Sequence, residues 1–337
     1  MEQSLSQKAL KNSAWNTAAF FAGIFFSIAV TPFVVHRLGV SGYGLIILIN
    51  TIISILSLFE LGMGSSLVKV VSQDVGQGNL DVVEEHVGAM VFLSLIISII
   101  GSIVFLCLAW FGFSLLKIPV EMAGTYRILF YIGAGNFFVS SLSTPFNSVL
   151  PALQRYDILS KISVVNGVLL NCATLILVAL GFRVQAVLFV QFLSSLILLI
   201  VYIIFTKRLL PTVNIRISTS IKVLSPVANF GFFVFLKNIS TQALAHFDKI
   251  IVTSVLGPAA VSFYSVPGSI PLKTVGIIQS ITDIFFPFTS NLSAQNDKEK
   301  VRAIYPRVMR NVILLAAACT FSIIIFGKKI LFFLAWA

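Results

Sequence analysis

The sequence predicts an all-α protein that crosses a membrane many times, and three observations support this prediction. Hydrophobic residues make up 58% of the 337 positions and charged residues only 10%, whereas soluble domains carry about a quarter charged residues. The apolar residues gather in runs of roughly 20, the length that spans a bilayer as a helix. The basic residues behind the net charge of +11 lie mostly between these runs, which indicates membrane topology and not nucleic-acid binding.

Nine apolar runs are long enough to be transmembrane helices. The seventh and eighth are the longest, at about 30 residues each, and are interrupted by polar residues, proline or glycine. The predicted spans are 14–36, 42–64, 87–111, 126–150, 160–180, 184–206, 226–256, 259–290 and 305–327.

The distribution of lysine and arginine predicts the orientation. With the N-terminus inside, fourteen basic residues fall in cytoplasmic segments and six in external ones, and such an excess marks the cytoplasmic side. The segment Met1–Ser13 is polar and has no cleavage-site pattern, so we expect no removable signal peptide. The sequence therefore predicts a multi-pass protein with a cytoplasmic N-terminus.

An internal echo predicts two repeated halves. "LGVSGYGLI" (Leu38–Ile46) and "LGPAAVSFY" (Leu256–Tyr264) both follow one long apolar run and open the next, 218 residues apart. This offset maps the first three spans onto the last three, and 328–337 onto Trp110–Pro119 as an interfacial stretch. Repeated halves are common in secondary transporters. We expect a first lobe at 1–222, with six spans, and an incomplete second lobe at 223–337, because two full halves need a longer chain.

Charged side chains inside the seventh span predict a functional surface, since charge in hydrocarbon is costly. Lys237, Thr241 and Asp248 share one helix face, with Lys237 and Asp248 about 16 Å apart along the axis. Lys249 points about 100° away from Asp248. These residues either line a cavity or are neutralised by neighbouring helices and order the bundle.

The eighth span and the end of the second contain the other candidates. Pro267, Gly268 and Pro271 interrupt the eighth span and predict either a hinge facing a cavity or a packing kink. Lys273 is a candidate anion contact. Glu60 and Asp283 lie near span ends and are either ion-coupling groups or solvated residues. The fourth span carries a polar stripe, which is more often packing than ligand: Asn136, Ser140, Ser141, Thr144 and Asn147.

No pattern predicts an enzyme, a cofactor or a metal site. Cys107, Cys172 and Cys319 lie far apart in apolar runs, without disulfide or metal spacing. A glycine-rich nucleotide loop is missing from the sequence, which argues against ATP as the direct energy source.

Four segments resemble the polysaccharide flippases of the multidrug/oligosaccharidyl-lipid/polysaccharide (MOP) exporter superfamily. They are "LGVSGYGLIILINTIISILSLFELGMGSSLVKVVS" (Leu38–Ser72), "LPALQRYDILSKISVVNGVLLN" (Leu150–Asn171), "FDKIIVTSVLGPAAVSFYSV" (Phe247–Val266) and "FFPFTS" (Phe285–Ser290). The order and spacing of these segments carry the resemblance, which extends over essentially the whole chain. Ser262 stands where members of this family commonly have glycine.

The resemblance implies two six-helix lobes around a central cavity that opens alternately to each side of the bacterial inner membrane. It implies transport of an undecaprenyl-pyrophosphate-linked oligosaccharide, as for O-antigen or capsule, to the periplasmic leaflet. Lys237, Lys249 and Lys273 would then meet the pyrophosphate, and Asp248 would couple transport to H⁺ or Na⁺. A polysaccharide polymerase, a chain-length regulator and membrane lipids are the implied partners. The chain departs from this pattern in length, since it lacks the last three helices of the second lobe.

Two other functions compete with this one. A cation-coupled exporter of drugs or metabolites would need an acidic, aromatic cavity, whereas the spans here hold three lysines against Asp248 and Asp283, with Glu60 at an edge. A membrane enzyme such as a glycan polymerase would need a large external loop, and the external loops predicted here are short.

Overall fold

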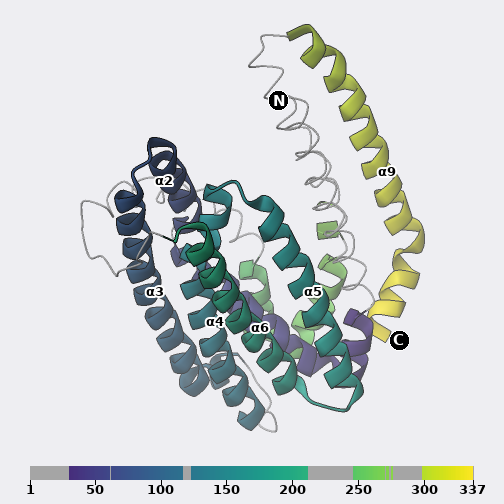
Figure 1. The fold of residues 1–337 in the computed structure, drawn as a ribbon. Helices are drawn as coiled ribbons and strands as arrows, with labels where there is room; N and C mark the ends of the chain where they lie inside the picture. Colours follow the sequence, from purple (N-terminus) through teal and green to yellow (C-terminus); the bar gives the residue numbers. More distant parts are fainter. Residues whose placement is uncertain are drawn as a thin grey trace. The chain divides into compact units, whose positions relative to one another are not determined.

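The computed structural model describes residues 30–60, 62–116, 123–211, 246–269, 271–272, 275 and 298–336. Over this part of the chain the regular structure is helical, without a β-strand (Figure 1). Five of the described helices are long and apolar enough to cross a membrane: Val30–Glu60, Asp81–Gly112, Tyr156–Ala179, Val184–Leu209 and Val312–Lys329. The predicted all-α class is therefore confirmed, while the count of nine spans stays a prediction.

The helices follow one another with short connections. Residues 30–56 are helical and run into η1 (Ser57–Glu60). Residues 246–256 and 258–269 form two further helical segments. The other elements are α2 (Met63–Gln77), α3 (Leu80–Leu115), α4 (Ala123–Ala152), α5 (Tyr156–Ala179), α6 (Val184–Leu209) and α9 (Lys298–Trp336).

The chain divides into two compact units. One comprises Met1–His36 with Phe263–Ala337, and the other comprises Arg37–Ser262. In the first unit, α9 exposes large apolar side chains such as Phe321 and Ile324, as expected of a helix that faces lipid. The lobe boundary predicted near residue 222 falls outside the described residues and stays a prediction.

Helix α4 is the centre of the unit Arg37–Ser262, where it packs against α2, α3, α5 and α6. It is long enough to cross a bilayer, yet it is not among the five apolar helices. Its serines, threonines and asparagines lower its hydropathy. A helix surrounded by other helices needs no apolar surface for lipid, so the polar residues of α4 can be kept inside the bundle.

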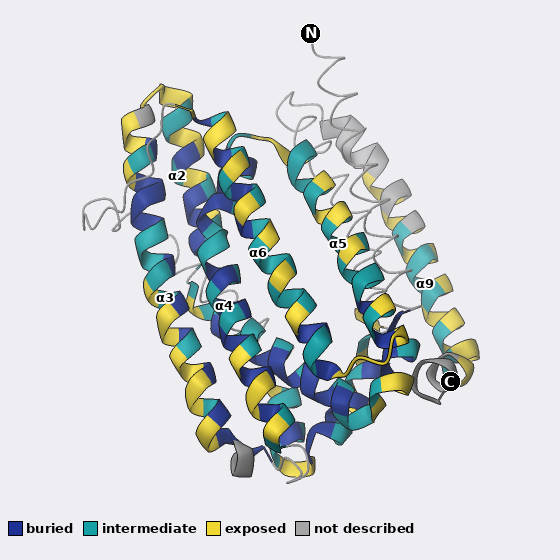
Figure 2. Cartoon of the chain, turned by 60° about the horizontal axis from the view of Figure 1, so that its bottom comes forward, coloured by how far each residue is buried: buried dark blue, intermediate teal, exposed yellow. Residues whose placement is uncertain are grey.

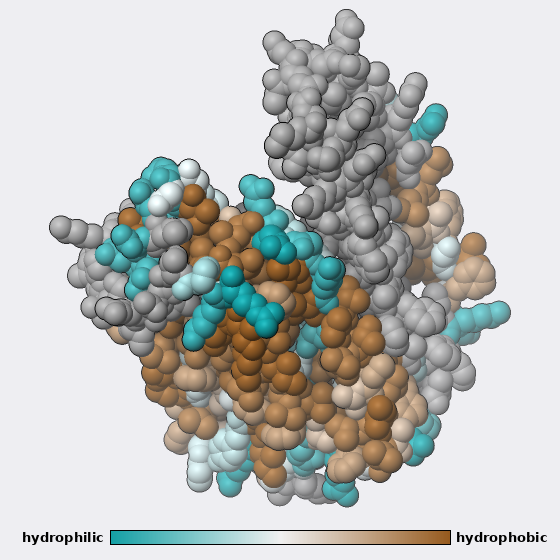
Figure 3. Space-filling model, in the orientation of Figure 1, coloured by the Kyte–Doolittle hydropathy of each residue, from teal (hydrophilic) through white to brown (hydrophobic). Residues whose placement is uncertain are grey.

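The outer helices show the opposite arrangement. Val165 and Leu169 of α5 and Ile103 and Phe111 of α3 are exposed, and Figure 2 shows such exposed positions along the outer faces of α3, α5 and α6. On the face drawn in Figure 3, hydrophobic side chains cover the middle of this unit, and hydrophilic ones gather toward its two ends. A broad apolar belt of this kind fits a lipid environment.

Two segments that the sequence placed between spans are helical. Residues 37–41 belong to the helical run 30–56, and the predicted cytoplasmic segment 65–86 contains most of α2 and the start of α3. Met63, Leu67 and Val71 of α2 are buried at four-residue intervals in a cluster with residues of α3 and α4. Their period is that of an amphipathic helix, which explains why a fairly polar segment folds against the bundle. Residues 328–336, expected at the interface, continue α9.

Candidate functional site

Four of the predicted site residues lie outside the described residues: Lys237, Thr241, Lys273 and Asp283. The shared face of Lys237 and Asp248 therefore stays a prediction. Pro267, Gly268 and Pro271 are described, and helical structure runs from residue 258 to 269 through the first two. Their role as a hinge also stays a prediction.

Asp248 and Lys249 lie in the helical segment described from residue 246 to 256, and both are partly buried. The Asp248 carboxylate accepts a hydrogen bond from the backbone N–H of Lys249, with 2.7 Å between nitrogen and Oδ1. His246 lies close enough to both residues to interact with them electrostatically. Asp side chains often accept hydrogen bonds from neighbouring backbone N–H groups, so this contact has an ordinary structural explanation.

Glu60 is the predicted residue that the structure brings into a polar cluster. It lies at the end of η1, partly buried, and its Oε2 accepts a hydrogen bond from Thr144 Oγ1 of α4 at 3.1 Å. Among the described residues, no lysine, arginine or histidine forms an ion pair with this carboxylate. A partly buried carboxylate without a counter-cation is costly, so Glu60 has the character of a functional group.

The α4 side of the cluster contains polar atoms without partners. The Ser141 hydroxyl is fully buried and lies near Glu60, yet it has no hydrogen bond of good geometry. Asn147 Oδ1 is also buried and unpartnered. Pro145 stands inside α4 and has no N–H, so the carbonyl four residues earlier, that of Ser141, loses its usual helical donor. The cluster thus holds more oxygen acceptors than donors.

Gly64 lets the start of α2 approach this cluster closely. A Cβ at Gly64 would lie 3.1 Å from Ser148 Oγ and 3.6 Å from Thr144 Cγ2. Ser148 in turn donates to the Thr144 backbone carbonyl at 2.7 Å. Sequence analysis noted the polar stripe of α4 but did not assign Gly64 or Pro145 to a site. The proline inside a polar helix is a signal that could have identified Pro145, whereas nothing local to Gly64 marks it.

The rest of the polar stripe ties helices together. Asn136 Oδ1 accepts a hydrogen bond from Ser195 Oγ of α6 at 2.7 Å, and Asn166 Oδ1 of α5 accepts one from Ser194 Oγ of α6 at the same distance. Hydrogen bonds of this kind are common between membrane helices. They give Asn136 a structural role that differs from that of the Glu60–α4 cluster.

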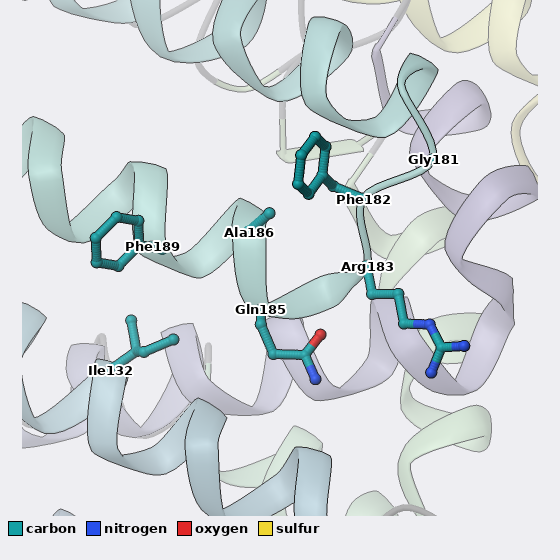
Figure 4. Close-up of a pocket in the computed structure, with 7 residues that line it drawn as sticks. All are labelled: Ile132, Gly181, Phe182, Arg183, Gln185, Ala186 and Phe189. Atoms are coloured by element: carbon teal, nitrogen blue, oxygen red, sulfur yellow. The ribbon is translucent and has the colours of Figure 1, made fainter.

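A separate hollow of about 530 Å³ lies at the turn between α5 and α6. It is lined by Ile132, Gly181, Phe182, Arg183, Gln185, Ala186 and Phe189. Figure 4 shows Ile132, Phe182 and Phe189 around it, while the Arg183 guanidinium points away from Phe189. The hollow shares no residue with the Glu60–α4 cluster, and sequence analysis did not single out any of its residues.

Comparison with known families and sequences agrees with the predicted resemblance. A family model described as "Polysaccharide biosynthesis protein" matches residues 34–335. The "Uncharacterized membrane protein EpsK" of Bacillus subtilis is 21% identical over 308 residues, which cover 90% of this chain and 61% of that protein. The "Putative O-antigen transporter" of Shigella flexneri is 20% identical over 286 residues, or 84% and 67% of the two chains. This chain therefore spans less than two thirds of the length of the Bacillus subtilis relative.

Solved structures show the same fold. A multidrug resistance MATE family transporter of the MOP superfamily, in an inward-facing conformation, has a TM-score of 0.70 at 14% identity over 96% of this chain and 76% of the other. A MOP superfamily transporter from Pyrococcus furiosus, described as having a binding pocket of reverse polarity, gives 0.69 at 16% identity over 98% and 75%. At such identities the likeness establishes the fold alone, and it confirms the MOP-type architecture predicted from the sequence.

Proposed function

Since this chain belongs to the polysaccharide biosynthesis protein family, we propose that it is a flippase for an undecaprenyl-pyrophosphate-linked oligosaccharide. It moves the lipid-linked repeat unit of an O-antigen, capsule or related glycan from the cytoplasmic to the periplasmic leaflet. The family match over 34–335 carries this proposal, and the similarity to a protein named as an O-antigen transporter supports the substrate class. The chain is a membrane transporter of this family and not an enzyme.

Transport is proposed to be ion-coupled and to proceed by alternating access. Coupling needs a group that carries charge in one state and is compensated in another, and a partly buried carboxylate meets this requirement. Glu60 supports this role because its described partner is a hydroxyl and not a cation. Asp248 and Asp283 remain proposed coupling groups, and Pro267, Gly268 and Pro271 a proposed hinge.

The substrate contacts follow from the chemistry of pyrophosphate, which carries negative charge and needs basic partners inside the bundle. Lys237, Lys249 and Lys273 are proposed for this role, with Thr241 beside them. The protein is proposed to lie in the bacterial inner membrane with its N-terminus in the cytoplasm, and to work with a polymerase and a chain-length regulator.

A cation-coupled exporter of drugs or metabolites is the second candidate. The observation that favours it is the fold shared with a multidrug resistance transporter. The three lysines predicted to lie inside spans fit a cationic drug poorly, since like charges repel in a medium of low dielectric constant. The flippase therefore fits the sequence better.

The flippase is tested by measuring the amount of lipid-linked sugar in cells depleted of the full-length protein. A flippase predicts undecaprenyl-linked oligosaccharide accumulating on the cytoplasmic side while surface glycan is lost. An unchanged pool, combined with altered sensitivity to cationic drugs, would replace the flippase by the exporter. Re-expression of the wild-type protein is the control that must restore both pool and glycan.

A further inference from the structure

The oxygen atoms around Glu60 have the composition of a cation site. Ser141, Thr144 and Asn147 succeed one another at three-residue steps, which places them within an arc of about 120° and about 9 Å of helix axis. Thr144, in the middle, contacts Glu60 directly. The cluster therefore combines one carboxylate, two hydroxyls and one amide oxygen on adjoining surfaces of η1 and α4.

Two polar atoms of this cluster are left unsatisfied by the residues that the structure describes. The Ser141 hydroxyl, at 0% exposure, lies near Glu60 but makes no hydrogen bond of good geometry, and the buried Asn147 Oδ1 has no hydrogen-bond partner. Buried polar atoms are almost always satisfied, so two unsatisfied oxygen atoms on α4, one of them near a carboxylate, point to a ligand that would complete the cluster. The Ser141 carbonyl freed by Pro145 is one more oxygen ligand of the type that interrupted helices offer to Na⁺ in transporters.

We propose that this cluster binds a sodium ion. Glu60 supplies the charge, and Ser141, Thr144 and Asn147 supply neutral oxygen atoms. Hard cations prefer oxygen ligands, and a single carboxylate balances a monovalent ion without leaving excess charge buried. In the proposed transport cycle, Na⁺ would be the coupling ion. Only this coupling role rests on the proposed function, because Na⁺ can bind whether or not the protein transports a glycan.

The test is Na⁺-dependent thermal stability of the purified full-length protein in lipid nanodiscs. Na⁺ is exchanged for K⁺ or choline at constant ionic strength and pH. We expect Na⁺ to raise Tm of the wild-type protein, because a ligand of the folded state stabilises it. Thr144→Val keeps the volume but removes the hydroxyl beside the carboxylate, and should weaken the apparent Na⁺ affinity about tenfold or more. Glu60→Gln should abolish the response, whereas Glu85→Gln, at an exposed position of α3, should keep it.

Each result decides the proposal. Equal stabilisation by Na⁺ and K⁺, or a full Na⁺ response in Thr144→Val and Glu60→Gln, would overturn it. Stabilisation by low pH alone would replace sodium with a proton. If Glu60→Gln does not fold, the wild-type ion dependence and Thr144→Val still decide. A flippase that fails the lipid-pool experiment can still bind Na⁺, so the two failures are distinguishable.

A second inference comes from the two echo segments, which meet in the structure within the unit Arg37–Ser262. Ser262 Oγ donates a hydrogen bond to the Val40 carbonyl at 2.6 Å. A Cβ at Gly44 would collide with the Pro258 carbonyl. Gly39 and Gly257 both have left-handed backbones, with φ of +73° and +86°, so the chain turns in the same way at equivalent points.

The pairs in contact are reciprocal. The 218-residue offset equates Val40 with Pro258 and Gly44 with Ser262. The structure pairs Gly44 with Pro258 and Val40 with Ser262. Val40 therefore contacts the residue equivalent to Gly44, and Gly44 contacts the residue equivalent to Val40. Reciprocal pairing of this kind is the mark of a twofold contact.

We infer that this contact is a latch that holds the two echo segments together in the present conformation. Its packing comes from Gly44, which has no side chain to separate the segments. Its hydrogen bond comes from Ser262, at the position where the resembled family commonly has glycine. The latch is therefore asymmetric, because the Ser262 hydroxyl donates a hydrogen bond to Val40 and the equivalent residue Gly44 has no side chain to do so.

Cysteine cross-linking in native membranes tests the latch. In a version without Cys107, Cys172 and Cys319, the pair V40C and S262C should cross-link much faster than V40C with S254C, which lies on the preceding helical segment. Adding Gly44→Ala should slow the first pair, because its Cβ pushes against Pro258. Equal rates for the two pairs, or no effect of Gly44→Ala, would overturn the latch. The readout does not depend on glycan export, so it stands apart from the proposed function.

Discussion

A single methyl group added at Gly101 should loosen the packing between α3 and α4. Gly101 lies in α3 opposite Phe137 of α4, whose side chain is 1% exposed. An added Cβ would lie 2.6 Å from Phe137 Cδ1 and 2.8 Å from Cζ, and closer still to Cε1. The ring has little room to move, because it is almost fully buried and packs near Phe105, with 6.4 Å between ring centroids.

The size of the effect follows from two opposing contributions. Replacing glycine by alanine inside a helix stabilises it by about 0.5–1 kcal/mol. Overpacking a filled core costs about 1–3 kcal/mol. Gly167 of α5 supplies the matched control, because nothing lies within 4 Å of its added Cβ. The helix contribution cancels in the comparison, so Gly101→Ala should be less stable than Gly167→Ala by about 1–3 kcal/mol.

Thermal unfolding of both variants in the same detergent measures this difference. For a unit of 150–250 residues, such as Arg37–Ser262, 1 kcal/mol moves Tm by about 2–4 °C, so Tm of Gly101→Ala should lie about 2–12 °C below that of Gly167→Ala. Equal Tm values would show that Phe137 yields freely and that α3 and α4 are not closely packed at this point. A lower Tm for Gly167→Ala would contradict the reasoning altogether.

Three further changes test other parts of the unit. Leu67→Ala removes a fully buried side chain of α2 and should cost about 2–5 kcal/mol, whereas Phe111→Ala, on an exposed surface, should cost far less in the same unfolding assay. Ser195→Ala deletes the hydroxyl that Asn136 Oδ1 accepts from. It should lower stability by about 1–3 kcal/mol, because the asparagine is left unsatisfied; unchanged stability would mean that water replaces the serine. Glu60→Gln should reduce surface glycan at normal protein level in membranes, and wild-type glycan would remove Glu60 from the coupling step.

The helices were predictable because their signals are local. Apolar runs and their lengths placed α5 and α6 within a few residues of their observed bounds, since a span needs about 20 apolar residues and little else. Helix α2 escaped this approach because it is amphipathic and only 15 residues long. Its buried residues Met63, Leu67 and Val71 are spaced as on one face of a helix. Because only this face is apolar, the segment is less hydrophobic than a membrane span and is not detected as one.

The partner of Glu60 was not predictable in the same way. Periodicity placed Ser141, Thr144 and Asn147 on one surface of α4, but 84 residues separate Thr144 from Glu60, and no local rule joins them. The contact depends on how α2, η1 and α4 pack, which Gly64 permits by its small size. Sequence could supply the polar surface and the carboxylate separately, and the tertiary structure was needed to bring them together.

In the echo segments, the sequence shows which residues are equivalent, and the structure shows that the two segments are in contact. A fixed offset equates Gly44 with Ser262, but it cannot say that the two segments touch. Once they do, a perfectly symmetric pair of glycines would give close packing alone. The change to serine on one side adds a hydrogen bond to Val40, and a net hydrogen bond is worth about 0.5–1.5 kcal/mol. A Ser262→Gly variant should therefore open up to about tenfold more readily. A faster reaction of a single cysteine at position 40 (V40C) with a thiol reagent in that variant would measure this opening.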